Sequence, residues 1–313
     1  MKIAIQGLGR MGMQMVRKLT EAEGFEVIGY DVNEDAVKEA AGHGATPCNT
    51  KEEVVKTFGD DRPVIWIMVP DKIVPAQVDE WLALLPKESI IIDGGNSNYT
   101  STQEVNKIVT AAGMHFMDVG TSGGVWGYEN GFCMMVGGGT PETYAVLKPV
   151  LECFEKPKAA HAYFGESGSG HFVKMVHNAV EYGMMQAIAE GYHIIKEGPI
   201  KGIDLAVVGD VWEHQSVVRS WLNELTRDVM RENPELEGIT GYVAASGEAH
   251  FTLEAARKAG IPMPVTQASV DVREASQKGE VNFATKVVAA QRNKFGGHNL
   301  NGEGAQPKAP EEK

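Results

Sequence analysis

The sequence KIAIQGLGRMG, residues 2–12, decides the fold of this chain. Its first five residues form a short apolar run, typical of a buried strand, that leads directly into a GxGxxG pattern at residues 7–12. Helical spacing follows over residues 13–20, and a second apolar run ends at Asp31, 19 residues beyond Gly12. Strand, glycine loop, helix, strand and acid in this order predict a dinucleotide-binding unit. The alternative is a glycine-rich turn that binds no ligand. The presence of Asp31 at the expected distance from the loop disfavours this alternative.

Each glycine of the loop has a physical role in this interpretation. Gly7 makes the tight turn, Gly9 lets a pyrophosphate approach the backbone, and Gly12 allows the helix to pack closely on the strand. The N–H groups at the start of the helix then face the phosphates. Asp31 can accept hydrogen bonds from the ribose hydroxyls and would repel a 2′-phosphate, so NAD is favoured over NADP. Arg10 inside the loop could still help to bind an additional phosphate.

Strands and helices continue to alternate after this unit. Strands are expected at residues 63–69, 89–92, 115–119, 132–136 and 162–164, and helices at residues 73–85, 100–112 and 141–152. The first two of these strands, residues 63–69 and 89–92, are nearly all apolar, as in a parallel sheet that is covered on both faces. Between two of them lies the loop GTSGG, residues 120–124. This loop could present N–H groups and a hydroxyl to a substrate carboxylate, or it could be an ordinary glycine-rich turn.

Beyond residue 164 the pattern becomes helical. In GESGSGHFVKMVHNAVEYGMMQ, residues 165–186, five polar residues share one face of a helix that is otherwise apolar or small: Lys174, His177, Asn178, Glu181 and Tyr182. A simple solvated face is the alternative to a face that lines a cleft. The lysine and the glutamate could supply a base and an acid to one bound molecule.

The chain is therefore expected to be α/β, with an N-terminal Rossmann-type doubly wound sheet followed by a mostly α-helical domain. We expect a dinucleotide-binding domain at residues 1–164 and a helical substrate and dimerisation domain at residues 165–300. The last stretch, residues 301–313, has no apolar anchor and is expected to be a disordered tail.

The composition is that of an ordinary globular protein with a strong acidic excess. Of the 313 residues, 43% are apolar and 23% are charged, and 42 acidic against 29 basic residues give a net charge of −13. This balance disfavours broad nucleic-acid binding, and an anionic small substrate would need a locally cationic pocket. No apolar run is long enough for a membrane span, and the N-terminus lacks the pattern of a signal peptide. We therefore expect a cytoplasmic protein without nucleic-acid or membrane partners.

The cysteines give no sign of a metal site. Cys48, Cys133 and Cys153 show no CxxC spacing and have no nearby histidine pair. This usage indicates a reducing compartment and no structural zinc, and no other ligand cluster stands out, so no metal is expected.

Several motifs together resemble the 6-phosphogluconate dehydrogenase family of the β-hydroxyacid dehydrogenase superfamily. They are GLGRMG at 7–12, DGGNS at 93–97, TSGG at 121–124, GHFVKMVHNAVEYGMMQ at 170–186 and QRNKFGGH at 291–298. The fourth is the most specific, since relatives that act on hydroxyisobutyrate or tartronate semialdehyde carry Lys-x-x-Asn-Asn at that point. The resemblance covers nearly the whole chain, which is similar to the short form of the family.

The resemblance implies a role for each matching residue. Lys174 is similar to the general base of the family and Glu181 to its general acid. The residues similar to substrate contacts are Asn96, Ser122, Gly123, Gly124, His177, Asn178, Tyr182, Arg273, Arg292 and His298, with the two arginines on the phosphate. The residues similar to cofactor contacts are Gly7, Leu8, Gly9, Arg10, Met11, Gly12, Asp31, Val69, Pro70 and Asn96. In the family the segment that resembles Arg292 to His298 comes from a second subunit, which implies a homodimer or homotetramer.

One position departs from the family pattern. The long form has a phosphate-binding lysine where this chain has Ser246. This replacement weakens the expectation of tight phosphate binding and, to a lesser extent, the expectation about the substrate. Each arginine taken alone is more often a surface ion-pair partner, and only the motif context favours phosphate binding. Arg219 also matches a family arginine, and a structural role is favoured for it.

The implied reaction converts 6-phosphogluconate, a phosphorylated sugar acid, and NAD to ribulose 5-phosphate, carbon dioxide and NADH, with NADP the less favoured cofactor. That reaction belongs to the pentose phosphate pathway and to gluconate utilization. One alternative is a non-decarboxylating NAD-dependent β-hydroxyacid dehydrogenase, which His177 and Glu181 disfavour. The other is a non-catalytic NAD-binding sensor or scaffold, which would be expected to have lost the glycine loop or the Lys174 and Glu181 pair.

Overall fold

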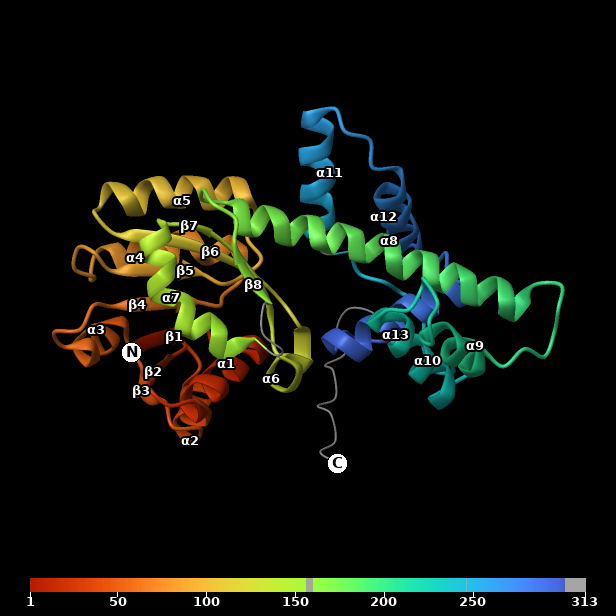
Figure 1. Ribbon diagram of the computed structural model, residues 1–313, viewed down its shortest axis with the longest axis horizontal. Coiled ribbons are helices and arrows are strands. Elements are labelled where there is room, and N and C mark those ends of the chain that lie inside the picture. The colour runs from red at the N-terminus through yellow and green to blue at the C-terminus, as the bar shows by residue number, and fades with distance from the viewer. Residues whose placement is uncertain (156–159, 246, 302–313) are drawn as a thin grey trace. The chain divides into compact units, whose positions relative to one another are not determined.

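The computed structural model describes residues 1–155, 160–245 and 247–301 of the chain. It divides into two compact units, Met1–Met175 and a second that begins at Val176. In the described residues, no helix is both long enough and apolar enough to cross a membrane. The two units are considered separately below, and Figure 1 labels their elements.

The first unit is built on one mostly parallel sheet. Its strands are β1 (Lys2–Gln6), β2 (Glu26–Tyr30), β3 (Thr46–Cys48), β4 (Val64–Ile67), β5 (Ile90–Asp93), β6 (His115–Ser122), β7 (Cys133–Gly138) and β8 (His161–Tyr163). They lie in the order β3-β2-β1-β4-β5-β6-β7-β8, and every neighbouring pair is parallel except β6 with β7. The strand order reverses between β1 and β4, which is where ligands bind in doubly wound folds, beyond the carboxyl ends of the strands.

Helices cover both faces of this sheet. The helices are α1 (Arg10–Glu21), α2 (Glu34–Gly42), α3 (Lys51–Phe58), α4 (Val74–Leu82), α5 (Tyr99–Ala111), α6 (Gly127–Asn130) and α7 (Pro141–Phe154), with 3-10 turns η1 (Asp71–Ile73) and η2 (Gly124–Trp126). Helices α1, α2 and α7 pack on one face, and α3, α4 and α5 pack on the other. Because both faces are buried, the central strands can be apolar throughout, as their sequences are.

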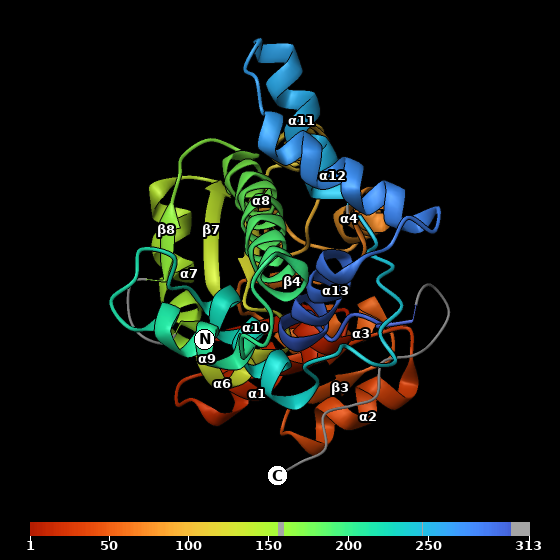
Figure 2. The ribbon, with the colours of Figure 1, turned by 90° about the vertical axis from the view of Figure 1, so that its right-hand side faces the viewer.

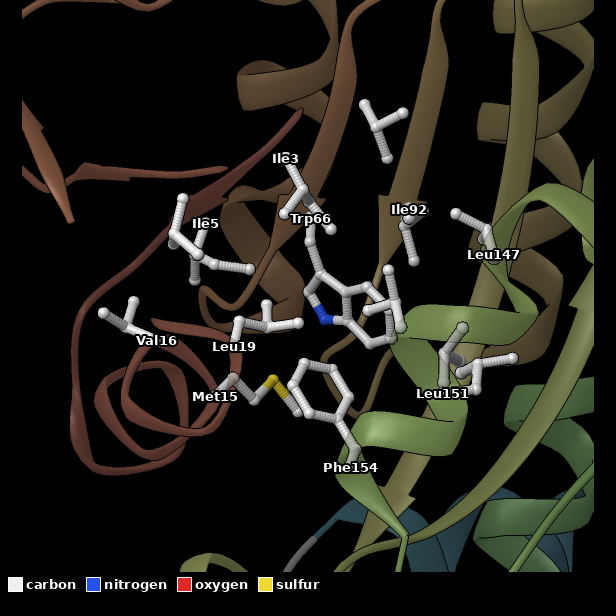
Figure 3. Packing of buried hydrophobic residues seen from close by; sticks show 14 of the residues in the cluster. Ile3, Ile5, Met15, Val16, Leu19, Trp66, Ile92, Leu147, Leu151 and Phe154 are labelled. Atoms are coloured by element: carbon white, nitrogen blue, oxygen red, sulfur yellow. The ribbon is translucent and has the colours of Figure 1, made fainter. Parts of the chain in front are cut away.

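Trp66 lies at the centre of the core on the α1 and α7 side. Its indole is fully buried and meets the ring of Phe154 edge-on, with 5.4 Å between the ring centres. Met15 and Leu19 of α1 belong to the same cluster, so residues far apart in the sequence close around one indole (Figure 3). This packing holds α1, and with it the glycine loop before α1, against β4.

The second unit is helical throughout its described residues. It contains the later part of α8 (Ser169–Glu197), followed by α9 (Leu205–Glu213), α10 (Trp221–Glu232), α11 (Gly247–Ala259), α12 (Pro264–Gln277) and α13 (Phe283–Gly296). The later turns of α8 share one apolar core with α9, α10 and α13, centred on Tyr192, Val229 and Val287. Helices α11 and α12 pack side by side (Figures 1 and 2). Side chains at helix starts, such as Asp204 and Asn282, accept the first free N–H groups.

The predicted fold class is confirmed, with corrections to single elements. Three short elements, α2, β3 and α3, were not among the predicted ones. The strand expected at residues 132–136 runs antiparallel to β6, because the turn between them is short enough to reverse the chain. The loop expected at residues 120–124 begins later, since Gly120, Thr121 and Ser122 belong to β6. Ser246 and the predicted tail beyond Asn301 lie outside the described residues.

Candidate active site

The glycine loop follows β1 and has the close contacts that its glycines predict. Gly7 has a φ of +92°, and a Cβ there would lie 2.5 Å from the carbonyl oxygen of Met68. A Cβ on Gly12 would lie 1.9 Å from the carbonyl oxygen of Gly7, so α1 crosses the loop at backbone distance. Gly9 has open space on its Cβ side. The first and third glycines are thus required by packing, and the second leaves room for an approaching group.

The start of α1 is left without any acidic or capping side chain. Gly9 occupies the N-cap position, no side chain accepts a hydrogen bond there, and the first turn contains no acid. The N–H groups of the first turn and the positive end of the helix dipole therefore suit an anion. These residues fit the pyrophosphate of a dinucleotide, as the sequence predicts for residues 7–12.

Asp31 lies at the end of β2 and is tied to the glycine loop. One carboxylate oxygen accepts the N–H of Leu8 over 2.6 Å, and the other accepts the N–H of Asn33 over 2.8 Å. A carboxylate has about four acceptor positions, so it can still accept hydrogen bonds from a ligand. The contact with Leu8 places the acid beside the loop, where a ribose would follow the pyrophosphate.

A second loop with predicted residues follows β5, next to the glycine loop. Asp93 ends β5, is buried, and accepts hydrogen bonds from the N–H of Gly95 and from the hydroxyl of Ser97 over 3.0 and 2.6 Å. Asn96 lies between these two residues and is exposed. Val69, with Pro70 after it, links the loops, since Cβ atoms on Gly7 and Gly95 would each lie 3.1 Å from it. The structure thus brings Val69 and the Asn96 loop to the glycine loop.

The segment Ser122–Gly124 is held to α1. Gly123 has a φ of +136°, and a Cβ there would lie 3.1 Å from the carbonyl oxygen of Gly131. Gln14 of α1 donates to the carbonyl oxygen of Gly124 over 3.5 Å and accepts the N–H of Tyr128 over 2.7 Å. The predicted substrate loop is therefore fixed to the helix that begins at the glycine loop. Sequence reasoning did not identify Gln14, because nothing local marks its long-range partners.

Lys174 lies in the second turn of α8 and is buried against β6. A Cβ on Gly120 would lie 2.3 Å from Cβ of Lys174, so the helix passes the strand at the closest possible distance. Cys133, which pairs with Ser122 across the two strands, is a neighbour of the lysine. Burial raises the pKa of the Cys133 thiol, and the positive charge of Lys174 opposes that rise.

The second unit contains the remaining polar residues of the α8 face, joined by hydrogen bonds. His177 Nδ1 donates to Asn178 Oδ1 over 2.9 Å and lies 3.9 Å from Glu181 Oε2. Asn178 Nδ2 donates to Glu248 Oε1 over 3.2 Å. Glu248 lies in the first turn of α11 and was not among the predicted residues. Its carboxylate balances part of the positive charge of Arg292 in the same unit.

Two arginines are buried beside Tyr182 in the same unit. Arg273 is 2% exposed, and its guanidinium carbon lies 3.2 Å from the centre of the Tyr182 ring. Burial lowers the pKa of Arg273 to about 10, Tyr182 partly opposes this, and Arg292 adds to it. Arg292 is 8% exposed, and burial also lowers its pKa against the opposing charges of Tyr182, Glu181 and Glu248. Buried cations of this kind are costly without an anion, so the pair suits an anionic ligand.

Arg292 lies close to Tyr182 and Glu181 in the second unit, where their charges act on its guanidinium group. Helix α13, which carries Arg292, packs in the core of that unit, with Val287 and Val288 fully or almost fully buried. His298 follows this helix and meets the ring of Phe295 edge-on. In the described residues, no group of three His, Cys, Asp or Glu side chains could hold a metal ion.

Two family models together match almost all of the chain. The NAD binding domain of 6-phosphogluconate dehydrogenase matches residues 2–165, and the 6-phosphogluconate dehydrogenase C-terminal domain matches residues 170–303. The chain belongs to the 6-phosphogluconate dehydrogenase family. The resemblance stated from its motifs is thereby confirmed, and this family member is a dehydrogenase with a dinucleotide-binding domain.

Two relatives match this chain over nearly their full lengths. A Bacillus subtilis protein, provisionally named as a 6-phosphogluconate dehydrogenase, is 39% identical over 95% of this chain and 98% of its own. The NAD(+)-dependent, decarboxylating 6-phosphogluconate dehydrogenase of Haloferax volcanii is 36% identical over 96% of this chain and 98% of its own. The similarity therefore spans both units.

Solved structures show the same fold. The 6-phosphogluconate dehydrogenase of Plasmodium falciparum, solved with NADP+ and with 6-phosphogluconate, has a TM-score of 0.79 and is 28% identical over 90% of this chain and 63% of its own. The 3-hydroxyisobutyrate dehydrogenase of Mycobacterium tuberculosis has a TM-score of 0.73 and is 24% identical over 91% of this chain and 97% of its own. The second likeness shows the fold alone, because one fold serves different substrates.

Proposed function

We propose that this dehydrogenase oxidises and decarboxylates 6-phosphogluconate to ribulose 5-phosphate and carbon dioxide while it reduces NAD. The observation that carries the proposal is the pair of buried arginines, Arg273 and Arg292, beside Tyr182. An acidic protein must concentrate positive charge locally to bind a phosphorylated acid, and guanidinium groups bind phosphate in a forked geometry. A small hydroxyacid without a phosphate would bring no doubly charged anion to these two cations.

Lys174 is proposed as the general base. It accepts the proton of the C3 hydroxyl while the C3 hydride leaves, so its amine must be neutral before that step. NAD, when bound, accepts the hydride. The protonated lysine then stabilises the C3 carbonyl oxygen as the 3-keto acid loses its carboxylate and an enediol forms. A buried side chain fixed on a helix that meets β6 is suited to such positioning.

Glu181 is proposed as the general acid that delivers a proton to C1 of the enediol. This role needs a carboxyl group that is partly protonated at that moment. His177, which lies 3.9 Å from the glutamate oxygen, and Asn178 are proposed to bind the substrate hydroxyls and carboxylate. Asn96, Ser122, Gly123 and Gly124 are proposed to share that task, with Tyr182 and His298 in the outer part of the site.

NAD is proposed as the preferred cofactor because of Asp31. The carboxylate lies at the glycine loop, bonded to Leu8, where it would repel a 2′-phosphate and accept ribose hydroxyls. The Haloferax volcanii relative is named as NAD(+)-dependent, which supports this choice, whereas the Plasmodium falciparum enzyme was solved with NADP+. Cofactor contacts are proposed for residues 7–12 and for Val69, Pro70 and Asn96.

The wider setting is also a proposal. We propose a cytoplasmic homodimer or homotetramer that acts in the pentose phosphate pathway or in gluconate utilization, with no nucleic-acid or membrane partner. Residues 1–164 would bind the cofactor, and residues 165–300 would bind the substrate and form the subunit interface.

A single assay separates the proposal from its alternatives. Purified protein is mixed with 6-phosphogluconate and either NAD or NADP, and NADH or NADPH formation is followed while carbon dioxide is trapped. We expect NAD reduction with an equal amount of carbon dioxide. Reduction without carbon dioxide would favour a non-decarboxylating β-hydroxyacid dehydrogenase. NAD binding without any reduction, with a panel of hydroxyacids, would favour the sensor or scaffold.

A further inference from the structure

Asp118 is a buried carboxylate that none of the proposed roles uses. It lies in β6, is fully buried, and accepts two backbone hydrogen bonds at the start of α8. The N–H of Gly168 donates to Oδ1 over 2.8 Å, and the N–H of His171 donates to Oδ2 over 2.9 Å. The strand thus supplies the acceptor that a side chain at the N-cap would otherwise supply, and its negative charge faces the positive end of the helix dipole.

The same part of α8 rests directly on the backbone of two strands. A Cβ on Gly170 would lie 2.4 Å from the carbonyl oxygen of Met135 and 2.6 Å from that of Asp118. A Cβ on Gly137 would lie 2.5 Å from the backbone nitrogen of Gly170. The helix start therefore has no room to move toward β6 and β7, and the two hydrogen bonds to Asp118 prevent it from lifting away.

Lys174 lies in the helical turn directly after these contacts. It lies three residues after His171, which is about 4.5 Å along the helix axis. If the backbone moves at His171, Lys174 should therefore move by nearly the same distance, because the helical turn between them is a rigid hydrogen-bonded unit. A side-chain contact adds a third restraint, since His171 Nδ1 and Thr102 Oγ1 share a hydrogen bond of 2.7 Å.

We propose that Asp118 is a positioning residue, which holds the first turn of α8 on β6 and thereby fixes Lys174 against Gly120 of that strand. The proposal rests on the catalytic role assigned to Lys174. All of its contacts lie within the first unit. Asp118 does not touch the reacting atoms, and its effect on catalysis passes through the helix.

The test compares Asp118→Asn with a matched control, Asp204→Asn. Asp204 accepts the N–H groups of Ala206 and Val207 at the start of α9, a helix that carries none of the predicted site residues. Asparagine removes one of the two Asp118 oxygens, and each of these accepts one of the bonds. At Asp204 a single oxygen accepts both bonds and asparagine keeps an oxygen, so the control removes the charge of a capping carboxylate without removing its acceptor. Three quantities are measured for each variant: kcat, the Kd for NAD, and amide hydrogen exchange over residues 168–175.

For Asp118→Asn we expect kcat to fall about 100-fold, the loss that a misplacement of about 1 Å produces. The Kd for NAD should stay at the wild-type value, because α1 and the glycine loop are unaffected, and exchange over residues 168–175 should become faster. Asp204→Asn should leave all three quantities unchanged. Wild-type kcat in Asp118→Asn would overturn the proposal, and so would a loss of kcat without faster exchange at the start of α8.

A second variant covers the case in which Asp118→Asn does not fold. Thr102→Val replaces the hydroxyl that bonds His171, and that also donates to the carbonyl oxygen of Asn98, with a methyl group. It should give faster exchange over residues 168–175, unchanged NAD binding and a smaller fall in kcat. Wild-type kcat and exchange in this variant would overturn the proposal. Hydrogen exchange needs no substrate, so it still tests the contact if the wild-type enzyme fails to oxidise 6-phosphogluconate, a result that would refute the proposed function instead.

Discussion

Gly120→Ala should disable this dehydrogenase by moving one helix a short distance. Gly120 pairs with Met135 in the middle of the β6 and β7 ladder and has an ordinary strand conformation, so alanine brings no backbone strain. Its only addition is a Cβ, which would lie 2.3 Å from Cβ and 2.8 Å from Cγ of Lys174. Carbon atoms in contact are about 3.5–4.0 Å apart, so the shortfall is roughly 1.2–1.7 Å.

Most of the missing distance has to come from a movement of α8 away from β6. Cβ of Lys174 is attached to the helix backbone and cannot rotate away as the end of a long side chain could. Overpacking of this kind costs about 1–3 kcal/mol of unfolding free energy. If α8 lifts by about 1 Å, the reacting groups are misplaced by a similar amount, and a loss of about 100-fold in kcat is expected.

The assay for this prediction separates catalysis from binding and folding. NADH formation gives kcat, quenching of tryptophan fluorescence gives the Kd for NAD, and calorimetry gives the unfolding temperature. The control is Gly42→Ala at the end of α2, where an added Cβ meets nothing within 4 Å. We expect lower kcat and unchanged NAD binding for Gly120→Ala, and wild-type values for the control. Wild-type kcat in folded Gly120→Ala would refute the reasoning.

Three further predictions concern the proposed site. Lys174→Met should abolish turnover while NAD binding, measured by fluorescence, persists; substantial residual activity would contradict the assignment of the base. Asp31→Asn removes a charged acceptor worth about 1.5–3 kcal/mol, so the Kd for NAD should rise by about 10- to 100-fold and the preference should shift toward NADP. If the ratio of kcat/KM with NAD to kcat/KM with NADP stays unchanged, the proposed role of Asp31 is refuted. Arg273→Met removes a buried cation: burial lowers the pKa of Arg273 to about 10, so the charged form is disfavoured in the folded protein at pH values below about 10. Urea unfolding without substrate should therefore show greater stability, whereas KM for 6-phosphogluconate should rise about 100-fold if the guanidinium binds phosphate; lower stability with unchanged KM would contradict both expectations.

The sequence could predict those features that depend on a few neighbouring residues. The glycine loop, the apolar strands and the polar face of α8 each follow from spacing over a turn or a strand. Short elements such as β3 carry too few residues for a periodic signal, and the direction of β7 depends on the chain reversal that follows β6. An acid directly after a short apolar run, as Asp93 is in IIID and Asp118 is in FMD, is a sequence signal for a buried carboxylate, and the motifs alone do not include it.

The predicted site residues are brought together to different extents. Leu8 and Asp31 are hydrogen-bonded, as are His177 and Asn178. The stacking of Arg273 on Tyr182 joins residues on two helices, and no local pattern in either helix indicates it. Glu248 likewise reaches Asn178 across 70 residues of sequence. Such pairs depend on how helices pack, which single-residue patterns do not encode.

By itself, the sequence determined that this chain folds around a dinucleotide loop and carries a lysine and a glutamate on one helix. Only the tertiary structure decided what holds that helix in place. The N–H of Gly168 and its acceptor Asp118 are 50 residues apart, and Gly120 meets Lys174 only because β6 and α8 pack in one register. Periodicity reports which face of an element is buried, whereas contacts between elements follow from packing and from the need to satisfy every buried polar group.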